Sequence, residues 1–146
     1  MKHLIIASII ACTFTLSAQA NEGQKLSPEF LETITTGLAE CAGIYNTVGI
    51  VKAQSGEDDA QATLEESFEW RAAAIFSAGM LHEDASYTEL EQKVDAIIEP
   101  TIKRYRVVNN WKEMGDKLHN ECAAMQNIQV QFYEAYIDFT RKASTK

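Results

Sequence analysis

Apolar residues recur every three or four positions along most of this 146-residue chain, which is the period of an amphipathic α-helix. The alternation typical of half-buried strands is rare, and the chain contains only two prolines. The pattern predicts four helices, which begin at Ser27, at Asp58 or Asp59, at Ser86, and at Asn109 or Asn110. An all-α protein is therefore expected.

Local signals support the expected helix ends. Ser27 followed by Pro28 is typical of an N-cap and a first helical position, and Gly56 in the segment QSGEDD indicates the end of the first helix. Ser86 and Glu89 have the spacing of a capping box. Pro100 falls inside the third helix, where its missing N–H group is expected to kink the helix or to split it.

Four amphipathic helices joined by short connections pack most simply as an antiparallel, up-down bundle in which the first and fourth helices are neighbours. Cys41 lies on the apolar stripe of the first helix, and Cys122 lies on that of the fourth. Both side chains are expected to point inward, and the small residues after each cysteine would allow the close approach that a disulfide needs. We predict one disulfide, between Cys41 and Cys122.

The first 20 residues have the parts of a secretory signal peptide: a basic start, an apolar run and the small-residue end SAQA. Cleavage after Ala20 would leave one helical domain, residues 21–146, with Cys41 and Cys122 as its only cysteines. Such a pair fits an oxidising compartment, so the predicted location is the periplasm, with secretion as the alternative. Lipidation of Cys12 within the segment IIAC is a further alternative.

The charge of the chain is acidic and unevenly distributed. Without the leader, twelve Lys and Arg side chains stand against twenty-one Asp and Glu side chains, a net charge of −9. Residues 57–99 hold twelve acids and two bases, whereas residues 100–146 hold eight bases and five acids. The balance argues against nucleic acid and anionic membranes as partners. The cationic segment KRYR (103–106) suits the C-terminal end of a helix, with an anionic partner as the alternative.

The sequence lacks familiar motifs for cofactor or catalytic chemistry. Covalent haem attachment needs Cys-x-x-Cys-His, and a di-metal carboxylate site needs two Glu-x-x-His pairs; the nearest match is Asp116 with His119. His82 and His119 are both expected on the surface. A cysteine nucleophile needs a free thiol, and both thiols belong to the predicted disulfide. We therefore expect no cofactor, no metal site, no membrane span and no enzymatic activity.

The second predicted helix has apolar residues on two faces. The face expected in the core contains Leu64, Phe68, Ala72, Ile75, Phe76 and Gly79. The other face contains the candidate residues for binding a partner: Trp70, Ala73, Ala74, Ser77 and Leu81. A large ring beside small residues is typical of an interface anchor. The alternative is that this face packs on a neighbouring helix of the bundle.

These features lead to the hypothesis of an exported, non-enzymatic helical-bundle protein that binds another protein, as an inhibitor, an immunity protein or an adaptor does. One alternative is a carrier of haem or of a small apolar ligand within the bundle. Another is an enzyme whose site has no recognisable motif. The sequence favours no particular partner and no particular oligomeric state.

Overall fold

The computed structural model describes residues 26–143, and nearly all of them are helical. The elements are α2 (Pro28–Ser55), α3 (Ala60–Leu81), α4 (Tyr87–Tyr105), the 3₁₀ turn η2 (Val108–Asn110), α5 (Trp111–Lys117), the π-helical turn η3 (Leu118–Cys122) and α6 (Ala123–Ala143). Residues 26–143 include no strand, so the predicted all-α class is confirmed. The predicted cleavage after Ala20 and the alternative at Cys12 lie outside the described residues.

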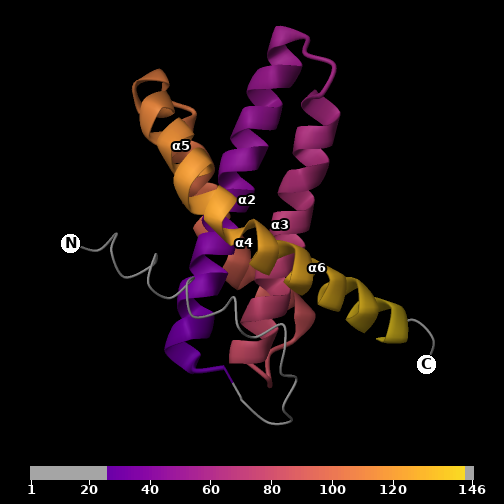
Figure 1. Ribbon diagram of the computed structural model, residues 1–146. Helices are drawn as coiled ribbons and strands as arrows, with labels where there is room; N and C mark the ends of the chain where they lie inside the picture. Colours follow the sequence, from indigo (N-terminus) through magenta and orange to yellow (C-terminus); the bar gives the residue numbers. More distant parts are fainter. Residues whose placement is uncertain (1–25, 144–146) are drawn as a thin grey trace.

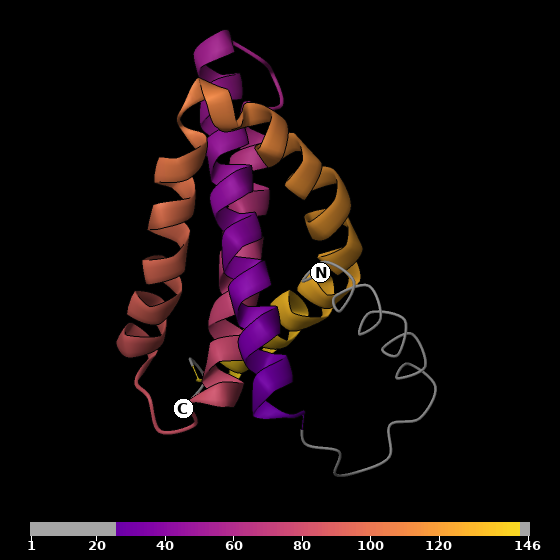
Figure 2. The same ribbon diagram turned by 90° about the vertical axis from the view of Figure 1, so that its left-hand side faces the viewer.

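The helices form an up-down bundle in which each long helix runs opposite to the one before it (Figures 1 and 2). α2 and α3 pack along one another, and α4 packs on both of them. α5, η3 and α6 follow one another without a loop, along a path that bends strongly (Figure 2). η3 contacts α2, whereas α6 packs mainly on α3 and crosses it at an angle (Figure 1). The last helical segment is thus attached to two different helices.

The disulfide between Cys41 and Cys122 joins α2 to η3, with 5.6 Å between the two Cα atoms. This confirms the predicted pairing. Both cysteines are buried. Beside them, Lys117 Nζ lies 2.7 Å from Glu40 Oε2 and 3.4 Å from Glu121 Oε2. An ion pair between α2 and α5 therefore flanks the covalent link.

The helix ends follow the predicted signals. Ser27 Oγ accepts a hydrogen bond from a backbone N–H of the first turn at 3.2 Å, and Gly56 ends α2 with a φ of 73°, a left-handed conformation that favours glycine. Ser86 N donates to Glu89 Oε2 at 2.7 Å while Glu89 N donates to Ser86 Oγ at 3.3 Å, which completes the capping box. Pro100 is exposed and lies inside α4, which continues through it. The proline therefore does not split the helix.

α2 contacts all the other long helices, and three of its glycines allow close approach. A Cβ atom at Gly43 would lie 2.9 Å from Thr101 Cβ in α4. A Cβ atom at Gly37 would lie 2.7 Å from Met125 Sδ in α6, and Gly49 is equally close to α3. These distances are shorter than ordinary van der Waals contacts. A side chain at Gly43 or Gly49 would push the helices apart, because backbone atoms of the neighbouring helix also lie at 3.2 Å, whereas at Gly37 the flexible end of Met125 can move aside.

Replacing Gly43 by alanine should lower the free energy of unfolding by about 1–3 kcal/mol. The added methyl group would meet the Thr101 side chain and, at 3.2 Å, the carbonyl oxygen of Ile98. Gly115→Ala is the matched control, because a Cβ atom there meets nothing within 4 Å. Alanine at an open helical position should stabilise by about 0.5–1 kcal/mol. Urea unfolding measures both variants, and effects of the same sign would contradict the close approach at Gly43.

The structure confirms only part of the prediction for α3: Ala72 and Ile75 are buried as expected, but two aromatic residues are placed differently. Phe68, expected in the core, is 69% exposed, whereas Trp70, expected at the surface, is fully buried and stacks on Tyr45 of α2. The small residues of the same face are also buried: Ala73, Ala74 and Ser77. This face packs on α2, which was the alternative expectation. One turn from Phe68, the Arg71 guanidinium donates hydrogen bonds to Asp95 of α4 at 2.8 and 2.9 Å. This contact between α3 and α4 is therefore polar.

Candidate functional site

Two cavities flank the connection between α3 and α4, near the beginning of α2 and the end of α6. The larger has a volume of about 1070 Å³ and extends from α2 to α4. The smaller has a volume of about 280 Å³ and lies between α3, α4 and α6. Four residues line both cavities: Met80, His82, Glu83 and Ala85. The connection therefore contributes to the walls of both.

The smaller cavity is mainly apolar. Its apolar lining includes Ile75, Phe76, Gly79, Met80, Leu90 and Phe139. At its edge lie Tyr87 of α4 and Tyr136 of α6, whose hydroxyl oxygens are 2.8 Å apart and share a hydrogen bond. Burial and this hydrogen bond raise the pKa of Tyr87. Apart from the two tyrosine hydroxyls, His82 and Glu83, this lining is apolar, so a ligand with an apolar body suits it.

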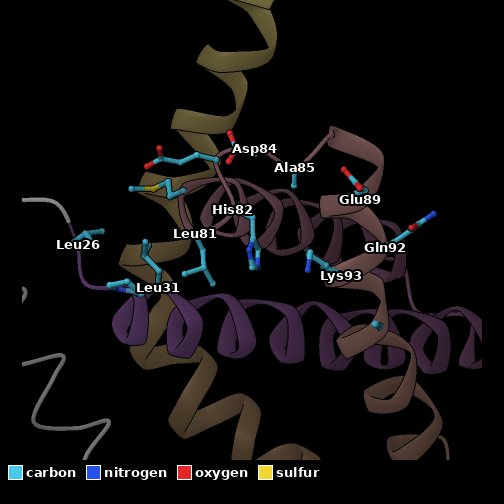
Figure 3. A pocket seen from close by; sticks show the side chains of 13 residues that line it. Leu26, Leu31, Leu81, His82, Asp84, Ala85, Glu89, Gln92 and Lys93 are labelled. Atoms are coloured by element: carbon cyan, nitrogen blue, oxygen red, sulfur yellow. The ribbon is translucent and has the colours of Figure 1, made fainter.

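The larger cavity has a mixed lining (Figure 3). Three leucines line it: Leu26, Leu31 and Leu81. His82 and Lys93 project toward the same space from the two sides of the α3–α4 connection. Glu89 is also part of the lining, but its carboxylate accepts hydrogen bonds from Ser86 N at 2.7 Å and Ser86 Oγ at 2.8 Å, and these bonds lower the pKa of Glu89. Glu89 is therefore engaged in capping α4.

Most of the predicted partner-binding residues reach neither cavity. Trp70, Ala73, Ala74 and Ser77 are buried between the helices, and Ser77 Oγ accepts a hydrogen bond from Thr35 of α2 at 2.8 Å. Leu81 is partly exposed and lines the larger cavity. The prediction that this face is an accessible surface is therefore wrong at the four buried positions, because the face forms the contact between α3 and α2.

His82 and His119 are both exposed, as expected, but their settings differ. His82 lines both cavities, whereas His119 lies in η3, away from them. Within residues 26–143, no group of three or more His, Cys, Asp and Glu side chains is arranged to hold a metal ion. No helix in the same range is long and apolar enough to cross a membrane.

Glu66 and Glu69 are neighbouring carboxylates of α3. Burial and the neighbouring charge of Glu66 raise the pKa of Glu69. Burial, together with Glu66, raises the pKa of Tyr45 to about 12. None of these three residues lines either of the two cavities.

The sequence pattern placed three residues of the smaller cavity in the core: Ile75, Phe76 and Gly79. Tyr87 and Tyr136 both fall on apolar stripes, and they are 49 positions apart, so no local pattern joins them. A glycine on such a stripe, Gly79, is the signal that could have indicated free space, since it leaves a gap where neighbouring turns have side chains.

Fold and cavities define this chain as a disulfide-linked, all-α bundle protein with an apolar cavity between three of its helices. Comparison of the chain with protein families, with curated proteins and with solved structures finds no match.

Proposed function

We propose that this chain is an exported, non-enzymatic binding protein that holds a small apolar ligand in the smaller cavity. The observation that carries the proposal is a space of about 280 Å³ bounded by three helices and lined mainly by apolar side chains. An apolar cavity of about 150 Å³ accepts one benzene ring, so this cavity has room for a ligand of about two fused rings. The hydroxyl pair of Tyr87 and Tyr136 offers one polar contact.

Two further observations support the other parts of the proposal. The disulfide between Cys41 and Cys122 is typical of oxidising compartments, and together with the leader-like first 20 residues it supports export, to the periplasm or out of the cell. Cys41 and Cys122 are joined in the disulfide, so neither supplies a thiolate nucleophile.

Naphthalene and naphthol should both bind to the oxidised protein. Naphthol is expected to bind more tightly, because its hydroxyl group can join the hydrogen bond between Tyr87 and Tyr136. At a concentration of about 100 times the Kd, either ligand should stabilise the protein by about 2.7 kcal/mol. Ligand fluorescence measures the affinity, and thermal unfolding with and without ligand measures the stabilisation.

Gly79→Leu tests whether the smaller cavity is the site. A Cβ atom at Gly79 would lie 3.4 Å from Leu90 Cδ1, an ordinary contact, so α3 accommodates a side chain that then fills the cavity. Binding should be lost. Gly115→Leu makes the same change at a helical position with open space around it and should leave binding unchanged. Loss of binding in both variants, or in neither, would exclude the smaller cavity as the site.

The hypothesis of a protein partner stays a prediction with weaker positional support. It depended on Trp70 and its small neighbours, which are buried. Among the predicted contact residues, Leu81 is the one with access to solvent at a cavity. Binding of a small apolar ligand is therefore the function that we favour.

A further inference from the structure

The turn between α4 and α5 combines exposed apolar side chains with cations. Val107, Val108 and Trp111 are 52%, 66% and 43% exposed. Residues 103–112 contain four cationic side chains and no acid. The turn lies at the opposite end of α4 from the two cavities (Figure 2). Its properties are therefore not explained by the proposed ligand site.

Hydrogen bonds hold the turn in this conformation. Asn110 Nδ2 donates to the carbonyl oxygen of Arg104 at 2.7 Å, and Asn110 N donates to the carbonyl oxygen of Val107 at 2.9 Å. The Arg104 guanidinium binds the Glu113 carboxylate and lies 5.6 Å from the ring centroid of Tyr105. The backbone thus keeps the two valines outside the contacts between helices. Transfer of such side chains from water to an apolar phase is favourable.

We propose that this turn docks on an anionic lipid surface. We call it the α4–α5 tip, and its contact residues are Arg106, Val107, Val108, Trp111 and Lys112. Aliphatic side chains enter the boundary between headgroups and acyl chains, where tryptophan is enriched. Cations beside them attract anionic headgroups. Lys112 pairs with Asp116 only at 3.8 Å in an exposed position, so this pair competes weakly with a headgroup.

A lipid surface fits the α4–α5 tip better than a protein partner does. A stable protein interface buries about 800 Å² on each partner, drawn from 20–30 residues, and three apolar side chains on one turn do not provide that area. Peripheral attachment to a membrane needs less contact area, because the burial of a few apolar side chains and the attraction between opposite charges act together.

The charge of the rest of the protein restricts the orientation of docking. The formal net charge of the chain is −8, and the connection between α2 and α3, at the same end of the molecule, carries Glu57, Asp58 and Asp59 (Figure 1). An anionic surface repels this connection, so the α4–α5 tip should approach the lipid with the α2–α3 connection turned away from it. The overall negative charge argues against binding to anionic membranes, but residues 103–112 are locally cationic.

Tryptophan fluorescence tests the proposal, because Trp70 is buried and Trp111 is exposed. Vesicles of equimolar phosphatidylcholine and phosphatidylglycerol should shift the Trp111 emission to the blue, whereas phosphatidylcholine vesicles should not. Added salt should weaken binding by screening. Lys112→Ala should weaken it about fivefold, the value of one cation near an anionic surface. Val108→Asp should abolish it.

Val130→Asp is the matched control, because Val130 is an exposed valine in α6 and not in the α4–α5 tip. It should bind the anionic vesicles like the unchanged protein, and circular dichroism should show that both aspartate variants fold. Equal binding to both kinds of vesicle, no shift in emission, or equal loss in the two variants would overturn the proposal. A protein captured through Val108 without any vesicle binding would also overturn it.

Discussion

Replacing Trp70 by alanine should lower the free energy of unfolding by about 3–5 kcal/mol, because the indole is fully buried and its removal leaves a cavity. The ring stacks on Tyr45 with 5.6 Å between the centroids, so the loss falls on the contact between α2 and α3. Trp70 Nε1 is buried without a hydrogen-bond partner, so the folded protein carries the cost of desolvating this N–H group. Because the alanine variant removes that cost, we expect a loss at the lower end of the range. Urea unfolding of the oxidised protein measures the change.

Phe68→Ala provides the comparison within the same helix. Phe68 is also aromatic and lies two residues from Trp70, but it is largely exposed. Its truncation should change the free energy of unfolding by no more than about 0.5 kcal/mol. A larger loss for Phe68→Ala than for Trp70→Ala would reverse the two faces of α3 and return Trp70 to the surface, as the sequence pattern suggested.

The helix ends were predictable because their causes are local. The capping box at Ser86 and Glu89 depends on two residues three positions apart, and the left-handed Gly56 follows directly after α2. The inward direction of Cys41 and Cys122 was also predictable, since each lies on the apolar stripe of its own helix. The disulfide followed from these directions once the order of helices in the bundle was assumed.

The faces of α3 were not predictable from their periodicity. Small apolar residues surround much of this helix, so the stripe through Phe68 and the stripe through Trp70 are nearly equivalent as patterns. The choice between them depends on which face contacts α2. The alanines beside Trp70 permit that contact, because small side chains allow two helix axes to come close.

The smaller cavity depends on a bend at η3, between α5 and α6, that the sequence pattern does not predict. In η3 the N–H of Ala123 donates to the carbonyl oxygen of Leu118, a five-residue step that interrupts the regular α-helical pattern. After this turn, Met125 and Gln129 lie buried on one side of α6, and α6 crosses α3. Only this crossing brings Tyr136 to Tyr87, so the cavity could not be assembled from helices placed as a straight bundle.

Replacing Cys41 and Cys122 together by alanine should lower the free energy of unfolding by about 4–5 kcal/mol, since the bond joins residues 81 positions apart and restricts the unfolded chain. Both alanines are buried where the sulfurs were, and neither leaves a free thiol. Urea unfolding measures the loss. Reduction of the disulfide in the unchanged protein should lower the free energy of unfolding by a similar amount. If the losses in the double variant and in the reduced protein differ by several kcal/mol, the loss is not due to the disulfide bond alone.

The structural consequence of losing this bond should be concentrated in α5 and α6. α6 packs mainly on α3, so the attachment of this last segment to α2 depends on η3, where the disulfide and the ion pair of Lys117 with Glu40 lie. The two side chains of this ion pair are partly buried, with exposed fractions of 24% and 35%. Lys117→Ala should therefore cost more than the loss of a surface pair, but less than the loss of the disulfide. Amide hydrogen exchange in the alanine double variant should therefore accelerate in α5 and η3 well before it does in α2 and α3. Uniform acceleration across all helices would mean that the disulfide stabilises the bundle as one unit, and that η3 is not the separate point at which the last helix is held.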